Sequence, residues 1–248
     1  MTPRNPKRVF IGMAVGNGQE GVTRWETSMS LINLVLSGSQ EYEFSLCPGG
    51  GCDTAHARNL MLHECLTRTD CGICLFIDSD EKFTAAHILR LLSWFRFPDI
   101  AMIAGLYPLK GRALRWSFGL WSKQSEKYPD LWEVGEVCTG FLAFRVGLAE
   151  AMIARYPETS YEISEHKYRG ETGYELFAMG PIPAREWIVD GVARTYKRRM
   201  SEDFMFSLRA ADMGVTRYVD PKIQLGHIGN FDFAELHKDA IEAALGRE

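Results

Sequence analysis

The sequence predicts an α/β fold in which a mostly parallel sheet is flanked by helices. The chain has 248 residues, 46% of them hydrophobic, which is enough for one large domain or two small ones. Short, continuous apolar runs at residues 9–15 and 73–77 are typical of strands that are buried on both faces. Stretches with helical spacing alternate with such runs, and this alternation favours parallel strands joined by helices.

The first half of the chain shows the alternation most clearly. For example, apolar residues at 88, 91, 92 and 95 follow the i, i+3, i+4, i+7 spacing of a helix face, and Thr84 is a suitable N-cap for that helix. The predicted elements are a strand at 9–15, a glycine-rich turn at 16–21, a helix at 23–36, a strand at 42–47, a helix at 54–67, a strand at 73–77, a helix after Thr84 and a strand at 100–106.

The second half is less regular. Its predicted elements are strands at 115–121 and 137–145, a helix at 146–155, a helix at 201–213 that Ser201 caps and Gly214 ends, a strand at 215–219 and an amphipathic helix at 233–245. Residues 156–200 show no clear periodicity. A long irregular stretch of this kind is usually functional.

The charge balance gives the chain no overall attraction to nucleic acid or to an anionic membrane. The formal net charge is −4 and the sequence pI is near 5.9. The only dense basic stretch is Tyr196-Lys197-Arg198-Arg199. The apolar run at 9–15 is too short to span a membrane. We therefore expect a soluble, cytoplasmic protein without a membrane span.

The cysteines admit two interpretations. Cys71 and Cys74 have the two-residue spacing of a zinc or redox pair. However, the chain has no second pair of this spacing, and Cys74 begins an apolar strand in which a thiol packs as a small hydrophobic group. We therefore expect reduced, structural thiols, as in cytosolic proteins.

Asp78-Ser79-Asp80 follows directly after the buried strand at 73–77. Side chains alternate in an extended segment, so the two aspartates project to the same side, about 6–7 Å apart. Open α/β sheets bind their ligands beyond the carboxyl ends of the strands. Paired carboxylates suit Mg²⁺ or Mn²⁺. The alternative is a simple acidic turn, because Asp and Ser both favour turn geometry.

Several segments, taken together, resemble the GT-A superfamily of nucleotide-sugar-dependent glycosyltransferases, in particular its small soluble bacterial and phage-type members. They begin with Ala-Arg-Asn at 57–59 and Asp-Ser-Asp at 78–80. The matching segments are residues 57–59, 75–80, 104–110, 138–145, 201–204, 218–221 and 225–229. They keep the order of the family and span roughly residues 8–230.

The resemblance implies a single GT-A-like domain over residues 1–248. Its nucleotide-sugar-binding half would cover about 8–110, its acceptor and catalytic half about 111–230, and a C-terminal helix 231–248. The residues that it implies are Asp78, Asp80 and His227 for the metal, Asp78, Ser79, Asp80, Arg58 and Asn59 for the donor, Ala14 and Val15 for the nucleobase, and Glu202 and Asp203 for the catalytic acidic pair.

The implied activity is a metal-dependent, hexosyl-type transfer from a nucleoside-diphosphate sugar to an acceptor hydroxyl. A UDP-sugar is favoured over a GDP-sugar, and Mn²⁺ or Mg²⁺ would offset the charge of the departing diphosphate. Asp203 would take the acceptor proton, with inversion at the anomeric carbon. Glu202 and Asp203 also have a structural interpretation, because acidic residues in a first turn stabilise the helix dipole.

Two other functions fit the same sequence. A sugar-phosphate nucleotidyltransferase would need a basic, glycine-rich loop after the first strand, and the turn at 16–21 contains no lysine. A non-catalytic nucleotide-sugar-binding module would keep the fold without turnover. The sequence leaves the acceptor open among a glycan, a lipid-linked sugar, a small metabolite and a nucleic acid.

Overall fold

The structure, a computed structural model, describes residues 3–15, 23–37, 41–50, 53–111, 113–189, 192–229 and 232–245, with the backbone alone at 188 and 189. The predicted glycine-rich turn at 16–21 lies outside these residues. No helix within the described ranges is long and apolar enough to cross a membrane.

The helices agree closely with the predicted positions. They are α1 (Trp25–Leu36), α2 (Thr54–Arg68), α3 (Ala85–Ser93), α4 (Val146–Arg155), α5 (Glu202–Asp212), α6 (Phe233–Leu236) and α7 (Lys238–Leu245), with 3₁₀ turns η1 (Trp94–Arg96), η2 (Pro157–Thr159) and η3 (His166–Tyr168). Thr84 caps α3 as predicted, in a reciprocal pair of hydrogen bonds with His87. The predicted terminal helix is divided into α6 and α7.

The strands are β1 (Asn5–Ala14), β2 (Glu43–Gly49), β3 (Cys71–Asp78), β4 (Glu81–Lys82), β5 (Met102–Leu106), β6 (Phe118–Gln124), β7 (Trp132–Val137), β8 (Phe141–Arg145), β9 (Ser160–Glu162), β10 (Thr172–Tyr174), β11 (Gly180–Val189), β12 (Val192–Met200), β13 (Arg217–Gln224) and β14 (Gly226–His227). Eight of them form the central sheet, in the order β2-β1-β3-β8-β5-β13-β7-β6.

The central sheet contains both parallel and antiparallel strand pairs. Strands β2, β1 and β3 are parallel, as are β5 and β13. β8 lies between β3 and β5 and runs antiparallel to both, and β7 pairs antiparallel with β13 and β6. Helices separate the strands in the first half of the chain, whereas β6, β7 and β8 follow one another without helices, and strands so connected pair in antiparallel fashion.

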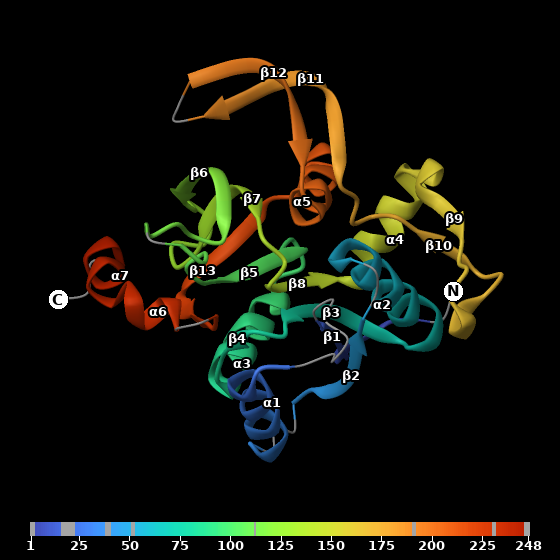
Figure 1. Ribbon diagram of the computed structural model, residues 1–248, viewed down its shortest axis with the longest axis horizontal. Helices are drawn as coiled ribbons and strands as arrows, with labels where there is room; N and C mark the ends of the chain where they lie inside the picture. Colours follow the sequence, from blue (N-terminus) through green and yellow to red (C-terminus); the bar gives the residue numbers. More distant parts are fainter. Residues whose placement is uncertain are drawn as a thin grey trace.

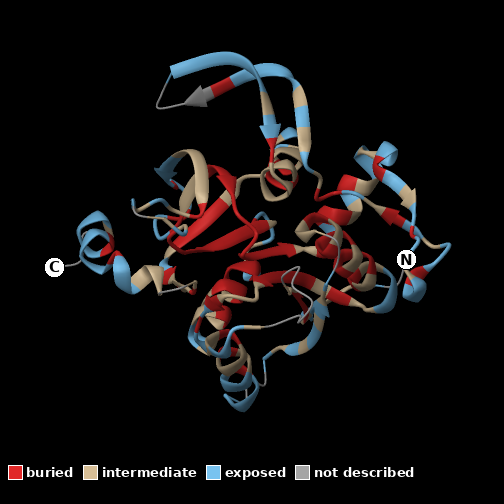
Figure 2. Ribbon diagram, in the orientation of Figure 1, coloured by how far each residue is buried: buried red, intermediate tan, exposed pale blue. Residues whose placement is uncertain are grey.

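Helices cover both faces of the sheet (Figure 1). On one face Ile73, Leu75 and Ile77 of β3 pack in the same apolar cluster as residues of α1 and α3. On the other face Cys74 and Phe76 share a cluster with residues of α2, α4 and α5. β3 is therefore buried on both faces, which confirms the α/β interpretation of its apolar run, and the buried core follows the sheet (Figure 2).

The cysteines that the structure describes are free thiols at positions 47, 65, 71, 74 and 138. Cys71 and Cys74 are buried in the apolar cluster that contains α2. Burial raises the pKa of both thiols, and most strongly that of Cys74. A protonated thiol in an apolar core packs as a hydrophobic group, which agrees with the structural interpretation.

Two predicted segments have a different structure. The strand predicted at 137–145 is interrupted at 138–140, where the chain turns at Gly140, so that Val137 ends β7 and only 141–145 form β8. The irregular stretch at 156–200 contains β9, β10 and a long hairpin of β11 and β12. Most of this hairpin is exposed, so no buried face imposes the alternation by which a strand is recognised in a sequence.

Candidate functional site

The sheet has a topological switch point at the carboxyl ends of β1 and β3. β1 pairs with β2 on one side and with β3 on the other. The chain leaves β1 toward β2 and leaves β3 toward β5 on the opposite side, so the two connections diverge there. Ala14, the last residue of β1, is the register partner of Asp78, the last residue of β3. Ligands of open α/β sheets bind in the crevice that such a point creates.

A cleft of about 140 Å³ lies at this point. Its lining is Ala14, Val15, Asp53, Thr54, Ala57, Asp78, Ser79 and Asp80. The structure thus brings together five of the residues predicted for the donor site, from two different strand ends.

Asp53 and Thr54 were not predicted, and they contribute the beginning of α2 to the cleft. The Asp53 carboxylate accepts a hydrogen bond of 2.7 Å from the backbone N–H of His56 and so caps the helix. The start of a helix offers unpaired N–H groups and a partial positive charge, both of which favour a phosphate. An aspartate directly before a helical pattern is the sequence signal that identifies such a cap.

Next to the cleft, three possible metal ligands converge. Ligand atoms of Asp80, Glu81 and His227 all lie within 4.8 Å of one another. Two short strands hold them together, because Glu81 of β4 is the register partner of His227 of β14. The backbone N–H of Ile228 also donates to the carbonyl of Asp80 at 2.8 Å. The structure therefore supports the predicted approach of His227 to the Asp-Ser-Asp turn.

The hydrogen bonding of His227 leaves one ring nitrogen free for a metal. Its Nδ1 donates to the carbonyl of Pro108 at 2.8 Å, so Nε2 carries the lone pair. Nε2 lies 3.8 Å from Asp80 Oδ1 and 3.9 Å from Glu81 Oε1. Burial lowers the pKa of this imidazole, which favours the neutral form that ligates metals.

Glu81 was not predicted, although it directly follows Asp80 in the sequence. Its side chain is completely buried, and neither carboxylate oxygen has a hydrogen-bond partner among the described residues. Burial, with the nearby charges of Asp78 and Asp80, raises the pKa of Glu81 well above its usual value. An unpaired buried carboxyl group is costly, and a divalent cation with oxygen and nitrogen ligands would satisfy it. The donor set fits Mn²⁺ or Mg²⁺.

Asp78 is not among the clustered ligand atoms of Asp80, Glu81 and His227, so a contact of Asp78 with the same cation, directly or through water, stays a prediction. Asp78 Oδ1 accepts a hydrogen bond of 2.7 Å from Arg58 Nη2. Arg58 Nη1 donates to Glu202 Oε1, also at 2.7 Å. Arg58 is only 2% exposed. Burial lowers its pKa, but the charges of Asp78 and Glu202 more than offset this and raise it.

Arg58 therefore ties the end of β3 to the beginning of α5. Its guanidinium bridges two carboxylates in this structure, whereas the resemblance implied a contact with the nucleotide. The bridge matters for the site because it brings the predicted catalytic acidic pair, Glu202 and Asp203, next to the Asp-Ser-Asp turn.

The two acidic residues of α5 have different surroundings. Glu202 is engaged by Arg58, whereas Asp203 Oδ1 accepts from the N–H of Phe204 at 2.8 Å and contacts the hydroxyl of Ser201. Ser201 occupies the N-cap position but makes no side-chain capping bond, contrary to prediction. Asp203 is the acidic residue of this pair that no arginine or lysine holds among the described residues.

Asn59 has a structural role in this fold. Its amide nitrogen donates to the carbonyl of Phe177 at 2.7 Å, and its amide oxygen accepts from the N–H of the same residue at 2.9 Å. Asn59 is 3% exposed. These two hydrogen bonds explain the residue without a nucleotide, so its predicted donor contact has no support in the geometry.

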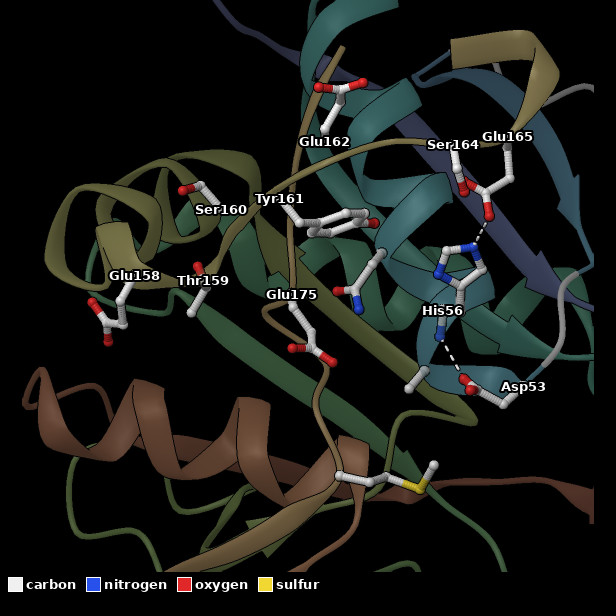
Figure 3. Close-up of a pocket in the computed structure, with 13 residues that line it drawn as sticks. Asp53, His56, Glu158, Thr159, Ser160, Tyr161, Glu162, Ser164, Glu165 and Glu175 are labelled. Carbon is white, nitrogen blue, oxygen red and sulfur yellow. Dashed lines mark hydrogen bonds and ion pairs between the residues drawn. The ribbon is translucent and has the colours of Figure 1, made fainter. Parts of the chain in front are cut away.

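A larger pocket of about 520 Å³ lies on the other side of the α2 N-terminus and shares Asp53 with the cleft (Figure 3). Among the described residues, five carboxylates line it, at positions 53, 158, 162, 165 and 175, and no lysine or arginine does. His56 Nε2 lies 2.5 Å from Glu165 Oε1. Burial and the charges of Glu165 and Glu175 raise the pKa of Tyr161 to about 12.

An acidic lining repels a diphosphate in both places, but the cluster of Asp80, Glu81 and His227, whose cation would offset that charge, adjoins only the smaller cleft among the described residues. Sequence reasoning missed this pocket because most of its lining belongs to the irregular stretch after residue 156, where no periodicity marks β9 or β10.

The sequence matches no protein-family profile and no curated protein. Among solved structures the chain resembles A197 from STIV, with 16% identity, a TM-score of 0.52 and coverage of 90% of this chain and 86% of that one. It also resembles GalNAc-T7 solved with UDP, GalNAc and Mn²⁺, with 8% identity and a TM-score of 0.52. That match covers 89% of this chain and 43% of GalNAc-T7.

A third match, to 4-diphosphocytidyl-2C-methyl-D-erythritol synthase from Anaerococcus prevotii, has 13% identity and a TM-score of 0.36, and it covers 65% of this chain and 81% of that one. At these identities the matches to A197 and GalNAc-T7 establish a shared architecture rather than a shared activity. The chain is similar to GalNAc-T7 at the level of the fold.

Proposed function

We propose that this protein is a metal-dependent glycosyltransferase that uses a nucleoside-diphosphate sugar, with UDP-sugars favoured over GDP-sugars. The observation that carries the proposal is the cluster of Asp80, Glu81 and His227 beside a cleft at the topological switch point. The fold it shares with GalNAc-T7, a protein solved with UDP, GalNAc and Mn²⁺, agrees with this interpretation.

Asp80, Glu81 and His227 would hold Mn²⁺ or Mg²⁺. When bound, the cation would offset the negative charge on a diphosphate leaving group. Among the described residues, the cleft itself is lined by three aspartates and by no basic side chain. A diphosphate would be repelled there unless a cation accompanied it, so the charge of the lining supports metal dependence.

Other residues of the cleft would position the donor. The N-terminus of α2, which lines the cleft with Thr54 and Ala57, carries a partial positive charge that would favour the diphosphate. Lys110, which contacts Asp80 Oδ2, adds a positive charge next to the cation ligands. Ala14 and Val15, at the end of β1, would face the nucleobase. The small side chain of Ala14 would let the flat base approach the backbone.

Asp203 is our candidate for the catalytic base. During transfer its carboxylate would take the proton from the acceptor hydroxyl while that oxygen forms a bond to the anomeric carbon. The bond from the anomeric carbon to the diphosphate oxygen would break, and the nucleoside diphosphate would leave with the bonding electrons. Glu202 is the weaker candidate because Arg58 occupies one of its oxygens.

The sugar-phosphate nucleotidyltransferase alternative has weaker support. It would need a basic loop for the nucleoside triphosphate at residues 16–21, which contain no lysine or arginine and lie outside the described ranges. A binding module without turnover would keep the metal cluster, so only a measurement of turnover separates it from a transferase.

The test is donor turnover. A panel of UDP- and GDP-sugars is incubated with the protein in Mn²⁺ or in EDTA, and release of the nucleoside diphosphate is measured. We expect release from UDP-sugars that requires Mn²⁺ and falls about 10²–10⁴-fold in Asp203→Asn. The exposed Asp239→Asn substitution on α7 is the matched control. Release that persists unchanged in EDTA, or in Asp203→Asn, would contradict the proposal.

A further inference from the structure

The hairpin of β11 and β12, called the arm below, projects from the body of the protein (Figure 1). Its strands contain ten and nine residues and pair antiparallel from Gly180 and Met200 at the root to Val189 and Val192 near the tip. At about 3.3 Å per residue, such a ribbon is about 30 Å long. None of its described residues lines the cleft proposed for the donor.

The arm is basic, in contrast to the rest of the chain. Residues 180–200 contain five lysines and arginines and two acidic residues, a formal charge of +3, whereas the whole protein has a net charge of −4. Two of the five are held at the root by acidic residues of the body. Arg185 pairs with Asp212 at 2.7 Å, and Arg198 pairs with Glu136.

The other three cations of the arm, Arg194, Lys197 and Arg199, are exposed. No ion pair or hydrogen bond engages their side chains within the described parts of the chain. Three free cations on one ribbon repel one another unless an anionic partner is present. Exposed cations without an internal partner are available to a polyanion.

The direction of these side chains follows from the strand. Arg198 faces the body, because its guanidinium lies 5.2 Å from the Trp187 ring and 5.4 Å from the Phe204 ring. Side chains alternate along a strand, so Lys197 and Arg199 lie on the opposite face. Two outward cations, about 6–7 Å apart, thus form a charged stripe on the free side of the arm.

The shape of the arm indicates which polyanion fits it. The major groove of B-form DNA is wide enough to admit a two-stranded β-ribbon, and several DNA-binding proteins use such a ribbon. The major groove of an RNA duplex is too deep and narrow for side chains to read. We propose that the β11–β12 arm binds duplex DNA, with Lys197 and Arg199 contacting phosphates.

The arm also leads to the candidate catalytic helix. β12 ends at Met200, and α5 begins two residues later with Glu202 and Asp203. DNA on the arm would therefore lie next to the proposed base. The binding of DNA does not depend on the transferase activity. A role of DNA as the carrier of the acceptor hydroxyl would rest on the proposed function.

The test measures binding of a fluorescein-labelled DNA duplex of mixed sequence by fluorescence anisotropy over a series of salt concentrations. The variants are the double substitution Lys197→Ala with Arg199→Ala and, as a control with the same change in charge, Lys7→Ala with Arg155→Ala. Both control residues are exposed and lie outside the arm. No donor and no metal are added, so the result is independent of the proposed activity. UDP binding in Mn²⁺ is measured in parallel on each protein.

We expect salt-dependent binding by the wild type. In the arm variant the slope of log affinity against log salt concentration should decrease by about two, because each lost phosphate contact removes about one unit. The control variant should match the wild type, and UDP binding should be the same in all three proteins. The absence of DNA binding, or equal binding by the arm and control variants, would overturn the proposal. Displacement of the duplex by polyglutamate as readily as by unlabelled DNA would indicate an acidic protein partner instead and would also overturn it.

Discussion

Glu81 and His227 face each other across the two-stranded sheet of β4 and β14, with His227 Nε2 3.9 Å from Glu81 Oε1. The two residues are far apart in the sequence, and this pairing brings the end of the chain back to the turn after β3. Because the Nδ1 of His227 is occupied by Pro108 and Glu81 has no hydrogen-bond partner among the described residues, both side chains present unused ligand atoms to the same point.

Replacing Glu81 with glutamine tests whether that point holds a cation. In EDTA, Glu81→Gln should be more stable than the wild type by about 1 kcal/mol, because a neutral amide is less costly to bury than a carboxylate. In Mn²⁺ at about 100 times the dissociation constant, the wild type should gain about 2.7 kcal/mol of stability and the variant none. Chemical denaturation in each condition measures both effects.

The matched control for this experiment is Asp239→Asn, which changes an exposed carboxylate on α7. It should behave as the wild type in both conditions. If Mn²⁺ stabilises Glu81→Gln as much as it does the wild type, Glu81 is not a ligand and the cluster must be reconsidered.

Removing the buried guanidinium of Arg58 should strongly destabilise the protein. Arg58→Ala leaves Asp78 and Glu202 without their shared partner, and the loss of one member of a buried ion pair costs about 3–5 kcal/mol. Arg58→Lys should recover only part of this, because an ammonium group lacks the planar fork that reaches both carboxylates. Urea denaturation measures the free energies of unfolding.

Arg68→Ala serves as a comparison, because Arg68 is about half exposed and pairs with Glu171 at 2.5 Å. A pair of this exposure contributes about 0–1 kcal/mol. If Arg58→Ala and Arg68→Ala lower the free energy of unfolding by the same amount, the Arg58 bridge contributes no more than a surface ion pair.

Asn59→Ala distinguishes a structural residue from a nucleotide ligand. The substitution leaves the N–H and C=O of Phe177 without their partner, so we expect a loss of about 1–3 kcal/mol in the free energy of unfolding. The affinity of the folded variant for UDP should be unchanged. The exposed Asn33→Ala substitution on α1 should change neither quantity. A fall in UDP affinity with unchanged stability would restore the predicted nucleotide contact.

The sequence predicted those parts of the fold that a buried face determines. β3 is apolar because it is buried on both faces, and its run ends at Asp78, so both the strand and the turn could be located. The helix around Ile88 likewise keeps one apolar face toward the sheet. The donor cleft followed from these elements, because Ala14, Val15 and the residues of the Asp-Ser-Asp turn all lie at strand ends.

Other features depend on contacts between distant segments, which local patterns do not show. Arg58 bridges Asp78 and Glu202, a contact that requires α2 and α5 to meet. Glu81 belongs to the metal cluster only because β4 pairs with β14. The antiparallel placement of β8 between β3 and β5 has no local signal either, since its residues are apolar in either orientation.

The measurement that tests the central claim most directly is calorimetric titration of UDP and GDP into the purified protein, in Mn²⁺ and then in EDTA. Wild type, Asp80→Ala and the control Asp239→Ala are compared. We expect UDP to bind in Mn²⁺ to the wild type and to the control. EDTA or Asp80→Ala should abolish this binding. If neither nucleotide binds in Mn²⁺, or if binding is indifferent to both EDTA and the loss of Asp80, the cluster of Asp80, Glu81 and His227 does not form a donor site.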